Sequence, residues 1–392
     1  MNRNLRAELD LVAEASVAAL RAPSILNSQP WRWRLAGDHA ELWADRSRQL
    51  TGLDPDGRLL MLSCGAALHH AVVTLHAAGY EAAVDRLPDT DRPDLVARFG
   101  RGPARPGHVS EANASTGDRG RGEAPGPAAA HPGRDGDPAA VGVRGGDLVR
   151  DGESAAAGVG GGDPGPDGEL AAVGVRGGDR GLDGELAAAI EWRHTDRRPF
   201  GDERPADAVL DELRAAAGRH GVHLQIVRDD QVTAFAGAVA HAGEVEREDP
   251  RFRADLRAWT NRAHGDGVTT QSVVATTRRT VAPRDFALKA GLAAGPGSDR
   301  GTVYALFVTD GDEARDWLAA GEALSDVWLT LTARGLAASP ISEVVEVAGV
   351  RNALRGLLGG VGNPAVAMRI GVPVQEDAPP ATPRRSPSAV LS

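Results

Sequence analysis

The chain has 392 residues, of which 42% are hydrophobic and 25% charged, and its formal net charge is −10 with a pI of about 5.6. This composition predicts a globular protein, and an acidic chain without a long basic run argues against nucleic-acid binding, which depends on neutralising phosphates. Cys64 is the only cysteine, so no intramolecular disulfide can form, and a reducing cytoplasm is the expected location. We expect no signal peptide and no membrane span, because no run of about 18 apolar residues is present.

Residues 1–100 predict a compact unit of helices and strands. Leu5 and Leu9 open a run of apolar residues at helical spacing, so an amphipathic helix is expected first. Apolar residues then alternate with arginines on the way to a Gly-Asp turn at positions 37–38, a pattern typical of a β-hairpin. Residues 57–78 are rich in leucine and alanine and predict a long helix.

Residues 101–186 differ in kind from the rest of the chain. They contain 23 of the 49 glycines and no aromatic residue. Ala139–Asp147 recurs with small changes as Ala155–Asp163 and Ala171–Asp179, which gives a repeat period of 16 residues. Each repeat offers only one or two valines to bury, and its glycines make ordering entropically costly. We therefore predict a disordered linker without a ligand site.

Residues 187–392 again predict a folded unit. Its apolar patterns indicate three helices and three strands; the helices are expected near 205–217, 229–246 and 312–334, and the strands near 222–227, 302–309 and 365–371. Residues 251–286 combine aromatic anchors with glycines that could act as hinges, so they are expected to form either a lid over a pocket or an ordinary surface helix and loop.

A polar run between two prolines is the most informative local feature. Residues 23–31 read Pro-Ser-Ile-Leu-Asn-Ser-Gln-Pro-Trp, and the two prolines restrict the backbone on either side. Pro23, Ser24, Asn27 and Gln29 could then face one flat polar ligand. The alternative is a helix end that leads into a polar loop.

A second motif combines arginines with a hydroxyl group. Residues 193–200 read Arg-His-Thr-Asp-Arg-Arg-Pro-Phe. Arg193, Thr195 and Arg197 suit a phosphate, because guanidinium groups offer a fork of donors matched to phosphate oxygens. The alternative is a solvated basic turn balanced by Asp196.

Together these runs resemble two motifs of the nitroreductase superfamily. The first resembles P-S-x-x-N-x-Q-P-W, which lies against the ring of bound FMN in that family. The second resembles R-x-S-x-R, with threonine in place of serine. The resemblance implies FMN as the cofactor, with Arg193 and Arg197 as ligands of its phosphate.

Two further runs resemble the same superfamily. Residues 335–343 match G-L-x-x-x-P-I-E-G, whose backbone faces the flavin N5 edge, except that Ser and Glu replace Glu and Gly. The resemblance adds four expected FMN-binding residues, Pro340, Ile341, Ser342 and Glu343. The tail at 382–387 resembles one in which a basic residue closes on the flavin phosphate; Arg385 fits that spacing best, and Arg384 is the alternative.

The motifs are divided between the two ends of the chain. Residues 1–100 contain the ring-facing run without phosphate arginines, and residues 187–392 contain the arginines without a second ring-facing run. In superfamily homodimers, two subunits contribute these two sets. The resemblance therefore implies an α+β nitroreductase-like fold built as a fused pseudo-dimer, with one FMN site complete and one lost, which could function as a monomer. The nearest branch is the Acg family of FMN-binding nitroreductase-like proteins.

This resemblance implies a flavin oxidoreductase. Hydride from NADH or NADPH would reach FMN at N5, and electrons would pass to a small nitroaromatic or quinone-like acceptor. We expect no catalytic side chain, since the flavin carries the chemistry, and the histidines show no metal-binding spacing. The alternative is an FMN-sequestering protein in which residues 251–286 cover the flavin; reduction of the bound flavin by NADPH would distinguish the two.

Overall fold

The computed structural model of the chain describes residues 3–105, 181–260, 262, 265–275, 277–375 and 377–392. These residues belong to one compact unit that contains both halves expected from the sequence. Most of the segment predicted to be a linker lies at 106–180, outside the described residues. Its two ends differ from the expectation, because residues 101–104 complete a strand and residues 182–186 open a helix.

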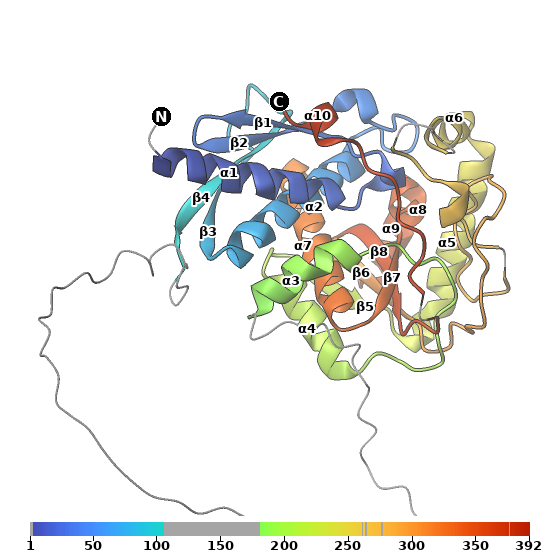
Figure 1. Cartoon of the computed structure of the whole chain (residues 1–392). Coiled ribbons are helices and arrows are strands. Elements are labelled where there is room, and N and C mark those ends of the chain that lie inside the picture. The colour runs from blue at the N-terminus through green and yellow to red at the C-terminus, as the bar shows by residue number, and fades with distance from the viewer. Residues whose placement is uncertain (1–2, 106–180, 261, 263–264, 276, 376) are drawn as a thin grey trace, which may run out of the picture. The chain divides into compact units, whose positions relative to one another are not determined.

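The N-terminal half is an antiparallel four-stranded sheet with two long helices (Figure 1). Its strands lie in the order β1-β2-β4-β3. The elements are α1 (Arg3–Ala18), β1 (Trp31–Ala36), β2 (His39–Ala44), α2 (Arg58–Ala77), β3 (Tyr80–Arg86) and β4 (Leu95–Ala104). The predicted hairpin is confirmed, and Gly37 makes its turn with a φ of 67°, which glycine adopts without strain. The long helix predicted at 57–78 is α2.

The C-terminal half repeats this arrangement with more helices. Its strands lie in the order β5-β6-β8-β7, again antiparallel. The predicted helices and strands are present within a few residues of their expected bounds. The helices are α3 (Leu182–Trp192), α4 (Asp207–Gly218), α5 (Val232–Glu248), α6 (Pro250–Trp259), α7 (Ala314–Ala333), α8 (Glu343–Glu346), α9 (Ala348–Leu357) and α10 (Pro387–Val390). The strands are β5 (His223–Ile226), β6 (Val303–Thr309), β7 (Ala337–Ile341) and β8 (Asn363–Gly371).

The two halves meet along α2 and α7 in a nearly symmetrical contact. His69 of α2 bonds Ser325 of α7 at 2.9 Å, and these residues are 256 positions apart. The same offset relates Leu62 to Leu318 and Gly65 to Gly321. A Cβ on Gly65 would meet the Leu318 carbonyl oxygen at 2.1 Å, and one on Gly321 would meet the Leu62 carbonyl oxygen at 1.9 Å. Equivalent residues therefore contact each other reciprocally, as in a two-fold dimer interface, and the chain is built as a pseudo-dimer.

Helix α2 is the core of the N-terminal half. Of the described helices, it alone is long and apolar enough, by length and composition, to cross a membrane, although we expected no such stretch from the sequence. Its most apolar window is 83% buried inside the protein. Leu68 and Ala71 on this helix are fully buried in the same cluster as Trp31 and Phe99 of the sheet. The length and hydropathy of α2 thus follow from its position between two packed layers.

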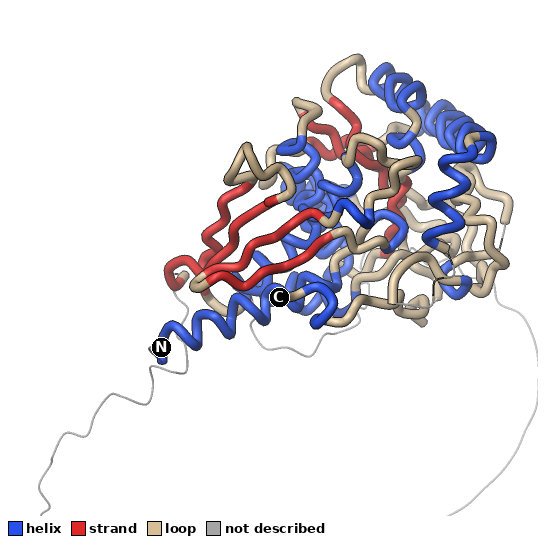
Figure 2. The backbone as a smooth tube through the Cα atoms, turned by 90° about the horizontal axis from the view of Figure 1, so that it is seen from above, coloured by secondary structure: helices blue, strands red, loops and turns tan. Residues whose placement is uncertain are grey.

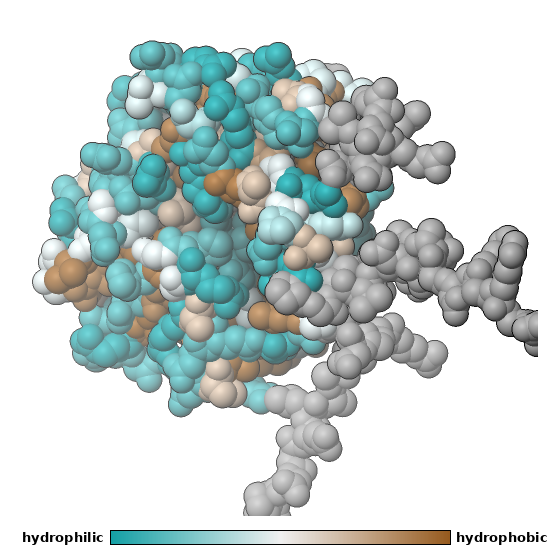
Figure 3. All heavy atoms as spheres, turned by 90° about the vertical axis from the view of Figure 1, so that its left-hand side faces the viewer, coloured by the Kyte–Doolittle hydropathy of each residue, from teal (hydrophilic) through white to brown (hydrophobic). Residues whose placement is uncertain are grey.

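The C-terminal tail returns to the N-terminal half. After β8 the chain passes α10, and Leu391 pairs with Trp33 of β1. The amide of Ser392 donates to the Trp33 carbonyl oxygen at 2.9 Å, and Figure 2 shows the C-terminus beside the N-terminal helix and sheet. The tail therefore links the two halves outside the α2–α7 contact. The face of the molecule drawn in Figure 3 is mostly hydrophilic, with hydrophobic residues in small separate groups.

Candidate functional site

A cavity of about 980 Å³, including the open space at its mouth, lies between the two halves. Its wall comes from the loop before β1, from α2 and α7, from the junction of β7 and α8, and from residues 279–286. Eight of the thirteen residues predicted to bind a cofactor lie on this wall: Pro23, Ser24, Thr195, Arg197, Pro340, Ile341, Ser342 and Glu343. The structure thus brings together segments that are far apart in the sequence. The other five predicted residues do not line the cavity: Asn27, Gln29, Arg193, Arg384 and Arg385.

The polar run before β1 has an unusual backbone. Leu26, Asn27 and Gln29 have φ values of 44°, 53° and 48°, which non-glycine residues rarely adopt and which cost free energy. Two hydroxyl groups hold this conformation. The Ser24 Oγ accepts from the Gln29 amide at 2.9 Å, and the Ser63 Oγ of α2 accepts from the amide of the residue after Ser24 at 3.2 Å. This turn places Pro23 and Ser24 on the cavity wall.

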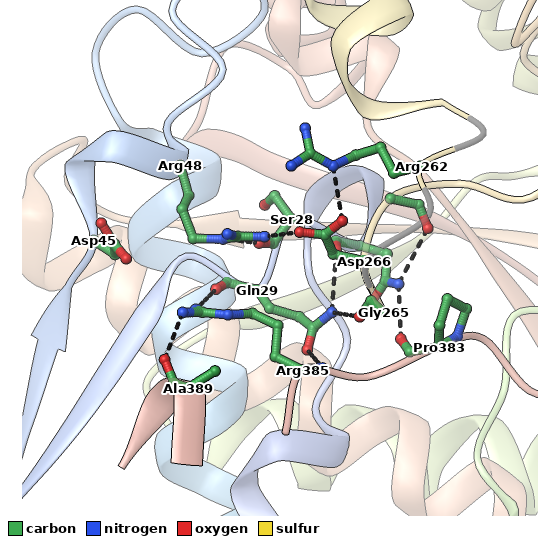
Figure 4. A network of polar contacts seen from close by, with 12 residues as sticks. Ser28, Gln29, Asp45, Arg48, Arg262, Gly265, Asp266, Pro383, Arg385 and Ala389 are labelled. Atoms are coloured by element: carbon green, nitrogen blue, oxygen red, sulfur yellow. Dashed lines mark hydrogen bonds and ion pairs between the residues drawn. The ribbon is translucent and has the colours of Figure 1, made fainter. Parts of the chain in front are cut away.

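Asn27 and Gln29 form hydrogen bonds to distant segments of the chain. Gln29 is completely buried; its Oε1 accepts from the Arg385 amide at 2.9 Å, and its Nε2 donates to the Gly265 carbonyl oxygen at 3.1 Å. The Asn27 Nδ2 donates to the Pro383 carbonyl oxygen at 3.0 Å. Figure 4 shows Gln29 between the tail and the loop at 265–266. In this structure these two amides connect distant segments and do not face the cavity.

Arg193 and Arg384 form a pair of cations behind the cavity wall. The Nη2 atoms of both donate to the carbonyl oxygen of Arg21, at 3.1 and 3.2 Å. The Arg193 guanidinium lies 4.6 Å from the ring centroid of Trp328, which itself lines the cavity. The buried Nε atoms of both arginines lack a hydrogen-bond partner. Neither arginine forms an ion pair with a carboxylate of the described residues.

Burial makes this pair of charges costly. It lowers the pKa of Arg193 to about 9, with a further contribution from Arg384, and it lowers the pKa of Arg384 to about 10. Two like charges with unused donors and no carboxylate are the arrangement that an anion would stabilise. The pair therefore has the chemistry to bind an anion, and Trp328, which lies against the Arg193 guanidinium, is also part of the wall of the main cavity.

Two sequence expectations about the arginines stay predictions, and the structure adds contacts that bear on them. Arg193 and Arg197 were expected to converge on one phosphate, but Arg197 lies over the Phe286 ring at 4.9 Å and donates to the Ser272 carbonyl oxygen at 3.2 Å. Arg385 was preferred over Arg384 in the tail, but its guanidinium donates to backbone carbonyl oxygens, including that of Gln29. Arg384 is the tail residue that lies beside Arg193.

The sequence analysis missed three arginines on the cavity wall. Arg369 of β8 forms an ion pair with Asp299 at 2.9 Å, and Arg279 approaches the same carboxylate at 3.6 Å. Arg284 pairs with Glu346 of α8 at 2.6 Å. No local motif marks these residues, since their partners come from other segments. Arg279 and Arg284 belong to the segment predicted as a possible lid; that segment forms one wall of the cavity, and its movement stays a prediction.

A buried polar cluster also lies at the contact of α2 and α7. Ligand atoms of His69, His220 and Asp326 lie within 4.8 Å of one another, the one such group in the described parts of the chain. Both Asp326 oxygens already accept from Arg219, at 3.0 and 2.8 Å, and one also bonds His220 at 2.9 Å. The Asp326 carboxylate is thus paired with Arg219 and His220, so the cluster acts as an internal ion-pair network. The histidines come from different elements, which is why spacing alone did not indicate it.

Comparison with known proteins gives the family. No family model matches the chain. The chain is 32% identical over 398 residues to the putative NAD(P)H nitroreductase Rv3131 of Mycobacterium tuberculosis, which covers 98% of this chain and 92% of that protein. The chain belongs to this family of putative NAD(P)H nitroreductases. A second relative, the putative NAD(P)H nitroreductase Acg of the same organism, is 29% identical over 383 residues, covering 96% of this chain and 93% of Acg. The resemblance to the Acg family is confirmed.

Solved nitroreductase structures are similar to about half of the chain. The nitroreductase with bound FMN from Bacteroides fragilis has a TM-score of 0.33 and 12% identity, and it covers 52% of this chain and 95% of its own. The FMN-dependent nitroreductase NfnB from Mycobacterium smegmatis, in complex with NADPH, has a TM-score of 0.35 and 16% identity, and it covers 52% and 96%.

Proposed function

We propose that this nitroreductase-family chain is an NAD(P)H-dependent oxidoreductase that holds one FMN in the cavity between its halves. The observation that carries the proposal is the Arg193–Arg384 pair, which has two unpartnered buried Nε atoms and no described carboxylate partner. The names of its relatives, putative NAD(P)H nitroreductases, motivate a reduction that uses NAD(P)H. Bound FMN would supply the two-electron redox chemistry that amino-acid side chains lack.

The residues present fit both ends of FMN. Arg193 and Arg384 would hold the phosphate through charge-assisted hydrogen bonds. The main cavity offers apolar wall for a planar ring, including Leu59, Leu62 and Ile341. Arg197 would place a positive charge on that wall, where it would stabilise negative charge that develops during reduction.

One site per chain is supported by the pseudo-symmetry. Leu62 and Leu324 lie on the cavity wall. Their counterparts under the 256-residue offset are Leu318 and Leu68, and both are completely buried in the N-terminal core cluster. These two counterparts have no exposed surface, whereas Leu62 and Leu324 are 7% and 3% exposed, and this difference supports one site per chain.

The finer assignment is a small-molecule electron acceptor of the nitroaromatic or quinone class, with NADH or NADPH as the transient electron donor. The relatives' name motivates the nitro compound and the nicotinamide. The main cavity opens to solvent and has both apolar and charged residues on its wall, as small-ligand sites commonly do.

The test is anaerobic reduction of the FMN-loaded protein. NADPH or NADH should bleach the visible flavin absorption, and a nitroaromatic or a quinone should restore it. Flavin that stays oxidised in the presence of both nucleotides would reject the oxidoreductase proposal and favour sequestration. A chain that retains no FMN after loading would reject both functions.

A further inference from the structure

Three glutamates surround one arginine at the edge of the main cavity. The Arg284 Nη2 lies 2.6 Å from a Glu346 oxygen and 3.0 Å from a Glu246 oxygen. Its Nη1 donates to the other Glu346 oxygen at 2.8 Å. Glu343 stands three positions before Glu346 on α8, so the two side chains leave the helix on one face. These four residues, here called the glutamate cluster, come from α5, α8 and the loop before residue 286.

The glutamate cluster is buried and carries too few positive charges. The side chains of Glu246, Glu346 and Arg284 are 4%, 0% and 7% exposed, and Glu343 is 5% exposed. Arg284 balances one of the three carboxylates, and Arg197 is the other cation that acts on Glu343. Several like charges in a dry site cannot all stay ionised, so protons are retained.

The pKa shifts of these glutamates agree with the retention of protons in the glutamate cluster. Burial raises the pKa of Glu343 above its ordinary range. The negative charge of Glu346 raises it further, while the positive charges of Arg284 and Arg197 lower it. Burial also raises the pKa of Glu246, again with Glu346 and Glu343 opposing its ionisation. A neighbouring acid is Asp54, whose pKa burial raises to about 6.

Glu343 is the member of the glutamate cluster that reaches the reaction space. It lines the main cavity together with Arg284, and it forms no ion pair within the described residues. Two polar atoms in the cluster, Arg284 Nε and Glu246 Oε1, are buried without a partner. Glu346 lines a second cavity of about 630 Å³, including the open space at its mouth. The glutamate cluster thus contributes residues to both cavities.

We propose that Glu343 donates a proton to the electron acceptor reduced in the main cavity, and that Glu246 and Glu346 return a proton to it. The proposal rests on the oxidoreductase function above. For a quinone, NAD(P)H supplies two electrons and one proton and becomes NAD(P)+. The second proton leaves the Glu343 carboxyl group and forms the second hydroxyl of the hydroquinone. Water on the side of the second cavity then returns a proton to the Glu343 carboxylate through Glu346. The overall reduction of the quinone therefore consumes one proton from solvent.

The direct test is Glu343→Gln, which keeps the shape of the protonated side chain but cannot release that proton. The rate of quinone reduction by the FMN-loaded variant should fall by about 100-fold or more relative to the rate at which NADPH reduces its flavin, and both rates are measured for the wild type and the variant. Glu248→Gln on α5 is the matched control, since Glu248 is exposed, and it should behave like the wild type. An unchanged rate of quinone reduction in Glu343→Gln would overturn the proposal.

A second measurement needs no cofactor. Infrared spectra of the wild-type protein at pH 7 should contain the C=O stretch of a protonated carboxyl group, and this band should shrink in Glu343→Gln but not in Glu248→Gln. Absence of the band from the wild type would also overturn the proposal. Failure of NADPH to reduce the wild-type protein would instead reject the oxidoreductase function. The infrared band would then still show whether Glu343 is protonated.

Discussion

Arg193 and Arg384 lie 191 positions apart in the sequence, yet their guanidinium groups donate to the same carbonyl oxygen, that of Arg21. One arginine ends α3 and the other belongs to the C-terminal tail. Both keep a buried Nε without a partner. Folding therefore brings together two cations, neither of which forms an ion pair with a described carboxylate, and this is the basis of our proposal that a phosphate binds here.

Replacing either arginine should weaken FMN binding. Arg193→Gln and Arg384→Gln each remove a charged donor, and hydrogen bonds to charged groups contribute about 1.5–3 kcal/mol. We expect the Kd for FMN to rise about 10- to 100-fold in each variant. Fluorescence titration of the apoprotein with FMN measures this change.

Riboflavin provides the control for that experiment, because it has the ring of FMN without the phosphate. Its Kd should be nearly the same in the wild type, Arg193→Gln and Arg384→Gln. Arg385→Gln should change the two affinities by similar factors, since this guanidinium is already bonded to backbone carbonyl oxygens. Equal losses of FMN and riboflavin affinity in the Arg384 variant would show that the phosphate lies elsewhere.

The α2–α7 contact should tolerate no side chain at its two glycines. A Cβ on Gly65 or Gly321 would fall about 2 Å from a backbone oxygen of the opposite helix, so the helices would have to move apart. Gly65→Ala and Gly321→Ala should each lower the free energy of unfolding by about 1–3 kcal/mol or more. Urea denaturation measures the loss.

Gly237→Ala is the matched control for these variants. Gly237 lies inside α5, and an added Cβ there would meet nothing within 4 Å. Alanine favours a helix by up to about 1 kcal/mol over glycine, so this variant should be as stable as the wild type or more so. Equal losses at all three positions would contradict the account of the α2–α7 contact.

Gln29 should anchor the tail. Gln29→Ala leaves the Arg385 amide and the Gly265 carbonyl oxygen without their side-chain partner, and each unsatisfied buried group costs about 1–3 kcal/mol. We expect limited proteolysis to cut the tail of this variant faster than that of the wild type. Gln271→Ala, which changes an exposed glutamine, should not alter the rate. A tail that is equally protected in Gln29→Ala would show that α10 holds it without Gln29.

Acid should destabilise the protein through a buried histidine. Burial lowers the pKa of His69 to about 3, so the folded chain keeps it neutral while the unfolded chain protonates it below about pH 6.5. Its contribution to stability is therefore complete above pH 6.5 and is lost as the pH falls towards 3, by about 1.4 kcal/mol per pH unit. His69→Gln should show a shallower decline between pH 6 and pH 4 in urea denaturation. Parallel curves of unfolding free energy against pH for the two proteins would contradict a neutral His69 in the folded chain.

Sequence reasoning was most successful where the signal is local. The run from Pro23 to Trp31 and the motif from Arg193 to Arg197 each lie in one segment, and both contribute residues to the cavity wall. The long helices were also visible from their apolar spacing. Strands β3 and β4 were not predicted as separate elements, because Ala82 and Val84 give only a weak alternating pattern.

The remaining features depend on contacts between distant segments. The choice between Arg384 and Arg385 depends on the path of the tail, which Gln29 fixes through the Arg385 amide. Arg284 is held at the cavity wall by ion pairs with Glu246 of α5 and Glu346 of α8, which lie far from it in the sequence or on another element. A single sequence contains no spacing that shows which arginines will meet which carboxylates.

The measurement that tests the central claim most directly is the amount of flavin held by the purified chain. The protein is saturated with FMN, desalted and denatured, and the released flavin is quantified by its visible absorption. We expect about one FMN per chain in the wild type and almost none when Arg193 and Arg384 are both replaced by Gln. Two FMN per chain would contradict the single site, and undiminished retention by the double variant would contradict the arginine pair as the phosphate site.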